Sequence, residues 1–190
     1  MTDGNMQPEL RRRANEMLGK AAALSPEERE ALLIKSWMAH DARWFQAVAM
    51  AFGLEAANRV NQAAVHEAGK AEAKRMTRAL ALPPVATLDD WLLTQEAIIG
   101  LMGPDLIDYK IVRTGDASYE LRVQRCFAHE QVTRAGVAQQ YECGIMPRLT
   151  GWLEGLGLGY EMTPPLGKCL KAEGRECVYA FKVRAPVAKL

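Results

Sequence analysis

The chain has 190 residues and a formal net charge of +1 at pH 7, with 49% hydrophobic and 25% charged residues. This is an ordinary globular composition, and a chain of this length can bury a core without disulfides. The near-neutral charge and the lack of a long basic run argue against a nucleic-acid-binding protein. No apolar run is long enough to span a bilayer and no signal pattern begins the chain, so we expect a cytoplasmic protein without membrane segments.

The first half of the sequence predicts helices. We expect residues 1–24 to form an N-terminal helical extension and residues 25–190 to form a single domain, whose helical part covers 25–104. Ser25, with Pro26 after it and Glu28 three residues on, is typical of a capping box at the start of a helix. Three long helices in this region would form one layer of the domain.

The boundaries of these helices follow from local signals. The helix that begins after Ser25 is expected to end at Phe52, because Gly53 favours a helix stop. The next is expected from Leu54 to about Leu82, before two prolines. Thr87 and the acidic residue three positions later predict the cap of a third.

The pattern then changes to the alternation typical of strands. Residues 108–127 predict a β-hairpin around Gly115-Asp116. One strand face carries Tyr119, Leu121 and Val123, and the other carries Glu120, Arg122, Gln124 and Cys126. A helix around Pro147 and two more strands follow. The predicted fold class is therefore α+β, with a helical N-terminal half packed on a small antiparallel sheet and a cysteine-rich, metal-binding C-terminal lobe over 105–190.

All four cysteines lie in this second half, at Cys126, Cys143, Cys169 and Cys177. A cytoplasmic chain keeps its thiols reduced, so they are either small core residues or metal ligands. No CxxC pair is present, but separate elements can still bring four thiolates to one tetrahedral zinc ion. Such a closed site would be structural. Basic residues flank the thiols and would favour thiolates, at Arg125, Lys168, Lys171 and Arg175.

A stretch of the C-terminal half resembles the 4-vinyl-reductase-like domain of bacteriochlorophyll biosynthesis proteins and of sensor modules in phenol- and toluene-responsive regulators. The resemblance lies in Cys143-Gly144, "GWLEGLGLGYE", Cys169, and Cys177 followed by "VYAFKV". It implies a structural zinc ion held by these three cysteines, which have the same 26- and 8-residue spacing as in the sensors. The ligand upstream of them would be Cys126 or, failing that, Glu120.

The full chain also resembles an uncharacterised bacterial cytosolic family related to L-2-amino-thiazoline-4-carboxylate hydrolase-like proteins. The signature of this resemblance comprises Trp37, His40, Asp41, Arg43, Trp44 and Phe45. It implies, as an alternative function, hydrolysis of a C–N bond in a small ring. The catalytic candidates would be a nucleophilic Cys126 or Cys143, or His40 and Asp41 as acid and base.

Polar residues on two apolar helix faces are candidates for a ligand pocket. Asp41 lies on a stripe with Trp37 and Trp44, with His40 at its edge, so it either forms a rim salt bridge or faces a ligand. Asn58 and Asn61 lie on an Ala-rich face and either hold helices in register or bind a ligand. The predicted ligand-binding residues are Trp37, His40, Asp41, Trp44, Asn58 and Asn61.

The Ala-rich face that carries Asn61 also predicts close packing on another helix, which is compatible with a homodimer. His129 follows Cys126 by three residues and is expected in a solvent-facing loop, although it can replace a cysteine as a ligand. Our leading functional hypothesis is a cytoplasmic protein that binds a small molecule and has a structural zinc site. The sequence leaves open whether the protein is an enzyme or a purely structural chain with buried thiols.

Overall fold

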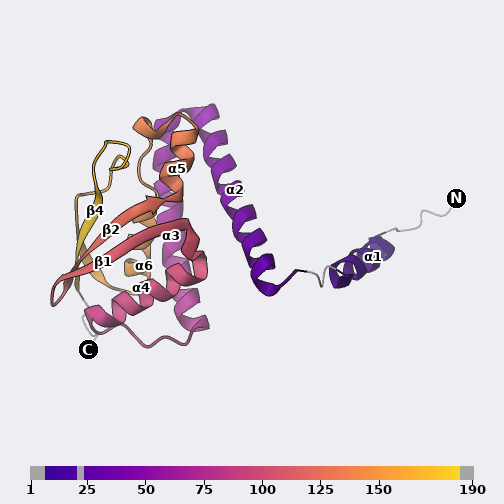
Figure 1. The fold of residues 1–190 in the computed structure, drawn as a ribbon, viewed down its shortest axis with the longest axis horizontal. Helices are drawn as coiled ribbons and strands as arrows, with labels where there is room; N and C mark the ends of the chain where they lie inside the picture. The colour runs from indigo at the N-terminus through magenta and orange to yellow at the C-terminus, as the bar shows by residue number, and fades with distance from the viewer. Residues whose placement is uncertain (1–6, 21–23, 185–190) are drawn as a thin grey trace. The chain divides into compact units, whose positions relative to one another are not determined.

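The structure is a computed structural model that describes residues 7–20 and 24–184. The chain divides into two compact units, one ending at Asp41 and the other beginning at Ala42. Helix α1 (Gln7–Lys20) belongs to the first unit, and helix α2 (Pro26–Phe52) contributes to both (Figure 1). This division falls inside α2, and the predicted extension of residues 1–24 lies wholly within the first unit.

The start of α2 confirms the predicted capping box. The Ser25 hydroxyl accepts a hydrogen bond from the backbone N–H of Glu28 at 3.2 Å, and the Glu28 carboxylate accepts one from the backbone N–H of Ser25 at 2.7 Å. These reciprocal bonds satisfy donors that the first helical turn leaves unpaired. None of the helices in the described residues is long and apolar enough to cross a membrane.

The second unit contains four further α-helices and two short 3-10 helices. They are α3 (Leu54–Ala79), α4 (Leu88–Met102), η1 (Pro104–Leu106), α5 (Phe127–Arg134), η2 (Ala138–Gln140) and α6 (Ile145–Gly155). Thr87 and Asp90 form the predicted capping box at the start of α4. Helix α3 ends at Ala79, three residues before the predicted Leu82. Helix α5 was not predicted, because its sequence follows a strand directly without a side-chain cap.

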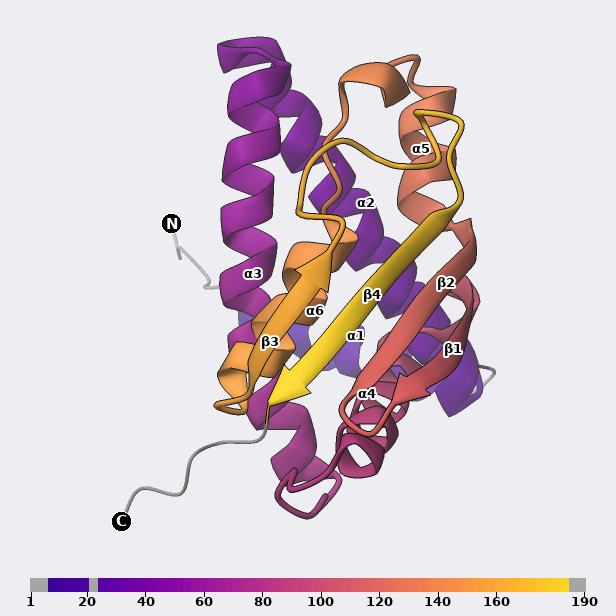
Figure 2. The same ribbon diagram turned by 90° about the vertical axis from the view of Figure 1, so that its left-hand side faces the viewer.

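The strands form one four-stranded antiparallel sheet (Figure 2). They are β1 (Ile107–Gly115), β2 (Ser118–Cys126), β3 (Gly159–Thr163) and β4 (Cys177–Arg184), in the order β1-β2-β4-β3. The β1–β2 pair confirms the hairpin predicted around Gly115-Asp116. The predicted α+β class, with helices in the N-terminal half and a small antiparallel sheet, is therefore confirmed.

The inner face of the sheet forms the main core with α4 and α6. The Tyr119 ring stacks on Phe181 with centroids 5.1 Å apart, and the Trp91 indole N–H donates to the Tyr119 hydroxyl at 3.1 Å. Burial of such apolar side chains on one face of each element supplies most of the driving force for folding. Helix α6 lies between the sheet and α3, and Figure 2 shows it behind β3. This layering places the beginning of α6 beside the ends of the central strands.

Helices α3 and α6 approach each other backbone to backbone. A Cβ added at Gly69 would lie 2.3 Å from the carbonyl oxygen of Arg148, and one added at Gly151 would lie 2.2 Å from that of His66. This contact lies on the face of α3 that carries Gly69, whereas Val60, Ala64 and Ala71 of the predicted Ala-rich face are exposed. Close packing of the Ala-rich face on another helix, and the homodimer that it suggests, therefore stay predictions.

Candidate functional site

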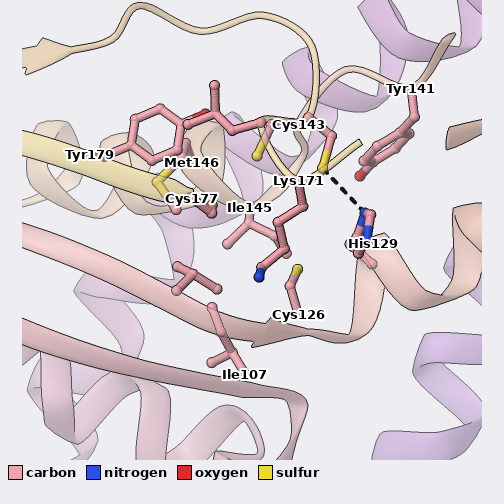
Figure 3. Close-up of a pocket in the computed structure, with 14 residues that line it drawn as sticks. Ile107, Cys126, His129, Tyr141, Cys143, Ile145, Met146, Lys171, Cys177 and Tyr179 are labelled. Atoms are coloured by element: carbon pink, nitrogen blue, oxygen red, sulfur yellow. Dashed lines mark hydrogen bonds between the residues drawn. The ribbon is translucent and has the colours of Figure 1, made fainter. Parts of the chain in front are cut away.

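A small cavity at one end of the sheet gathers all four cysteines (Figure 3). Its volume is about 20 Å³, which is enough for one water-sized guest. Pockets for organic ligands are typically about 300–1,000 Å³, so this cavity fits a single atom or ion rather than a substrate. The lining residues that the discussion below uses are Cys126, Cys143, Cys169, Cys177, His129, Lys171, Tyr141 and Tyr179.

Cys126 and Cys177 come from the ends of neighbouring strands. Cys177 begins β4 and pairs with Val123 of β2, whose side chain faces the core. Strand β1 pairs with the opposite edge of β2. There Asp108 pairs with Arg125 and Tyr109 pairs with Val123, so Gln124 is an extra residue that forms a β-bulge. The bulge reverses the alternation, and Cys126 is therefore buried on the inner face. Its predicted position on the outer face was wrong for this reason.

Cys143 and Cys169 are brought together by a short antiparallel bridge. The backbone N–H of Cys143 donates to the carbonyl of Gly167 at 2.9 Å, and the backbone N–H of Cys169 donates to the carbonyl of Tyr141 at 3.1 Å. Glu142 and Lys168 form the bridge between these bonds. Two segments that are 26 residues apart thus present their thiols to the same cavity.

Side chains of α3 hold the segment that carries Cys143. The Asn58 amide donates to the carbonyl of Gln140 at 2.7 Å, and its oxygen accepts from the backbone N–H of Glu142 at 3.1 Å. The Gln62 amide donates to the Cys143 carbonyl at 3.2 Å. Asn61 lies against Gly144, where an added Cβ would be 2.7 Å from its Nδ2 atom. Asn58 therefore has the structural role that was one of its two predicted alternatives.

Replacing Asn58 with alanine should lower the free energy of unfolding by about 2–3 kcal/mol, because two buried backbone groups lose their partners. The matched control is Gln62→Ala, which removes a single bond to the same segment and should cost about 1 kcal/mol. Urea unfolding monitored by circular dichroism measures both changes. Equal costs for the two variants would contradict the role assigned to Asn58.

Two of the cysteines lie at the beginning of helices. Cys126 directly precedes α5, and Cys143 lies two residues before α6. The positive end of a helix dipole lies at the N-terminus of the helix and favours the thiolate form of a nearby cysteine. The Cys126 side chain makes no capping hydrogen bond to α5.

Burial in this apolar cavity raises the pKa values of Cys126, Cys143 and Cys177. The pKa of Cys143 is raised to about 11, and negative charge on the neighbouring Cys126 and Cys169 thiols adds to the effect of burial. Burial and the other three thiols raise the pKa of Cys177 to about 12. A thiol with such a pKa is not an activated nucleophile at neutral pH.

Two cationic or basic side chains complete the cavity wall. His129 lies half-buried in α5 with its Nδ1 atom 3.7 Å from the Cys169 sulfur, so the prediction of a solvent-facing loop residue was wrong. The Lys171 ammonium donates to the carbonyl of the bulged Gln124 at 2.7 Å. This bond ties the segment that follows Cys169 to the bulge that orients Cys126.

Sequence reasoning missed two tyrosines at the site. The Tyr179 hydroxyl is within hydrogen-bonding reach of the Cys143 sulfur, and the Tyr141 hydroxyl accepts the backbone N–H of Gly144 at 3.2 Å. Tyr179 alternates with Cys177 on one strand face, and this signal was available in the sequence. The Tyr141 ring meets Phe45 edge-on at 5.8 Å, so one residue of the tryptophan-containing signature packs against the cavity wall.

The other predicted site residues lie elsewhere. His40 and Asp41 are exposed in the first unit, with His40 Nδ1 3.5 Å from the Asp41 carboxylate. Trp44 is 47% exposed in the second unit. The lining of the cysteine cavity includes none of Trp37, His40, Asp41, Trp44, Asn58 or Asn61. The alternative ligand Glu120 also does not line it, because its carboxylate pairs with Arg122 on the outer face of β2.

The donors around the cavity have the right chemistry for zinc, although they do not yet converge on a point. Over residues 7–20 and 24–184, no three His, Cys, Asp or Glu side chains are grouped closely enough to hold a metal ion. Thiolate and imidazole ligands suit zinc, and the cavity lining supplies both. The residues therefore fit a zinc ion, provided that the sulfurs close in on it.

Comparison with known sequences places the chain in a family without an assigned activity. No curated protein matches the chain significantly. Residues 23–146 match a family of unknown function, DUF6125, and the match includes Cys126, His129 and Cys143. Since the match covers more than half of the 190 residues, the chain belongs to the DUF6125 family.

Proposed function

We propose that this chain is a zinc-binding protein in which Cys126, Cys143, Cys169 and Cys177 hold one structural zinc ion. The observation that carries the proposal is the arrangement of the thiols. Four cysteines from four separate segments, the only cysteines in the sequence, line one cavity with room for a single ion.

The ligand set makes the site structural rather than catalytic. Four cysteine ligands fill the tetrahedral coordination of zinc and leave no position for water or substrate. When bound, zinc supplies a cross-link between segments that are distant in the sequence. The four residues join the end of β2, the start of α6, the segment at 167–169 and the start of β4. The ion would therefore fasten the C-terminal part of the domain together.

The cytoplasmic location and the small-molecule ligand that we predicted from the sequence are part of this proposal. All four cysteines are free thiols in the structure, which leaves each of them available as a ligand. The resemblance to sensor modules supports a small-molecule ligand for the zinc-stabilised domain. That ligand would bind outside the cysteine cavity, whose volume of about 20 Å³ is too small for it.

The alternative function, C–N hydrolysis, has less support from the geometry. A cysteine nucleophile needs a lowered pKa and access for its substrate, whereas Cys143 is buried and its pKa is raised to about 11. His40 and Asp41 are exposed and contact each other, but the described contacts do not place them in a buried, substrate-sized site. The zinc proposal is therefore the one that the contacts favour.

Counting reactive thiols tests the proposal. In native protein purified with zinc, we expect all four thiols to resist a thiol reagent and to become reactive together when a chelator is added. In the control Cys143→Ala, the three remaining thiols should react without a chelator. A single fast thiol in native protein, unaffected by the chelator, would favour the hydrolase and overturn the zinc proposal.

A further inference from the structure

The cavity offers one more metal-binding group than a tetrahedral zinc ion can use. Besides the four cysteines, His129 lines the cavity from the first turn of α5. Its Nδ1 atom lies 3.7 Å from the Cys169 sulfur, and Figure 3 shows this contact as a dashed line. The cysteine set by itself gives no reason for an imidazole to face the sulfurs.

The distance between these two atoms is close to that between two ligands of one zinc ion. With Zn–S near 2.3 Å, Zn–N near 2.0–2.1 Å and tetrahedral angles, the two ligand atoms are separated by ~3.6 Å. An imidazole 3.7 Å from the Cys169 sulfur therefore lies beside the position that Cys169 would take in such a site.

Cys169 is the cysteine that His129 is best placed to replace. Cys126 ends β2, Cys177 begins β4 and Cys143 lies two residues before α6, so regular elements position these three thiols. Cys169 instead lies in the segment between β3 and β4, where its sulfur contacts His129. Exchange between these two neighbours leaves the other three ligands undisturbed.

We propose that His129 is a reserve metal ligand, which takes the position of Cys169 when that thiolate leaves the zinc site. The proposal rests on the zinc site proposed above. In the exchange, one Zn–S bond breaks and one Zn–N bond forms through the lone pair of Nδ1, with the imidazole proton on Nε2. The released thiolate takes a proton from solvent, so no oxidant or other reactant is required.

The consequence is a cross-link that can release one segment without losing the ion. The segment after Cys169 is held by bonds from Lys171 to Gln124 and from Gln139 to the carbonyl of Ala172. When Cys169 no longer binds zinc, these two side-chain hydrogen bonds still hold the segment. The zinc ion remains bound to Cys126, Cys143 and Cys177. The site thereby regulates how firmly this segment is attached to the domain.

Metal titration of four variants tests the reserve ligand: Cys169→Ala, His129→Ala, the double variant, and His40→Ala as an exposed-histidine control. We expect the affinity for Zn²⁺ to change less than about 10-fold in each single variant and to fall at least about 100-fold in the double variant, where only three ligands remain. With Co²⁺ as the probe, Cys169→Ala should give a tetrahedral spectrum with a weaker thiolate-to-cobalt band. His40→Ala should match the wild type.

Each other outcome overturns a defined claim. If Cys169→Ala loses Zn²⁺ as completely as the double variant, His129 does not replace Cys169. If His129→Ala alone lowers the affinity about 100-fold, His129 is a permanent ligand rather than a reserve one. If the wild type binds no metal, both the zinc site and the reserve ligand are wrong. Circular dichroism of each variant, with and without metal, identifies losses that follow from unfolding.

Discussion

Removing zinc from the native protein should lower the melting temperature of the second unit by roughly 10 °C. An ion that binds only the folded state at about 1,000 times its Kd stabilises that state by about 4 kcal/mol, and 1 kcal/mol corresponds to about 2–4 °C for a chain of this size. Unfolding should stay cooperative, because Cys126 and Cys143 belong to the same core as the sheet, α4 and α6. Thermal unfolding with and without a chelator measures the shift.

Hydrogen exchange should locate this loss of stability. We expect faster exchange of the backbone amides around Cys143 and Cys169, whose bridge lies beside the cavity, and little change in the β1–β2 hairpin. Cys143→Ala is the control, since its melting temperature should be low from the start and insensitive to the chelator. A wild-type melting curve that the chelator leaves unchanged would rule out the structural role of zinc.

Replacing Gly151 with alanine should cost at least about 3 kcal/mol of unfolding free energy, because overpacking that meets backbone cannot relax by turning a side chain. The added Cβ would lie 2.2 Å from the carbonyl oxygen of His66 and 3.3 Å from the Cα of Gly69. Relief requires α3 and α6 to separate, and these helices also carry the residues that position Cys143. The variant should therefore bind zinc more weakly as well.

Gly100→Ala is the matched control for this prediction. Gly100 is also a helical glycine, in α4, but no heavy atom lies within 4 Å of its added Cβ. There the substitution should stabilise the protein by about 0.5–1 kcal/mol, through helix propensity alone. Denaturant unfolding of both variants measures the change in the free energy of unfolding. Similar changes at the two glycines would contradict the tight contact between α3 and α6.

Local signals in the sequence were sufficient for most of the elements. The capping boxes at Ser25 and Thr87 depend on residues three positions apart, and the structure contains both. The alternation of Tyr119, Leu121 and Val123 predicted their shared buried face correctly. These features depend on interactions within one helix turn or one strand, which a single sequence records directly.

Features that depend on contacts between elements were not predictable in the same way. The bulge at Gln124 reverses the face of Cys126, yet nothing in the alternation marks the extra residue. The Ala-rich stripe of α3 did not identify the face that α3 uses for close packing, because Val60, Ala64 and Ala71 are exposed. The contact with α6 depends instead on Gly69 and Gly151, whose lack of side chains lets the two backbones approach.

The candidate site shows the same division. The spacing of Cys143, Cys169 and Cys177, together with the resemblance it supports, led to the set of thiols that the structure places around one cavity. His129 was considered as a replacement ligand, but its position was predicted wrongly, because it was expected in a solvent-facing loop instead of in α5. A helix that begins directly after Cys126 turns the side chain three positions later toward the same cavity.

The most direct test of the account is the metal content of the purified chain. Native mass spectrometry of the wild type and of Cys143→Ala, both purified without added chelator and supplied with equal zinc, measures the number of ions bound to each folded chain. The account predicts one zinc ion per wild-type chain and none on Cys143→Ala under the same conditions. A wild-type chain that stays metal-free in the presence of excess zinc, while folded, would contradict it.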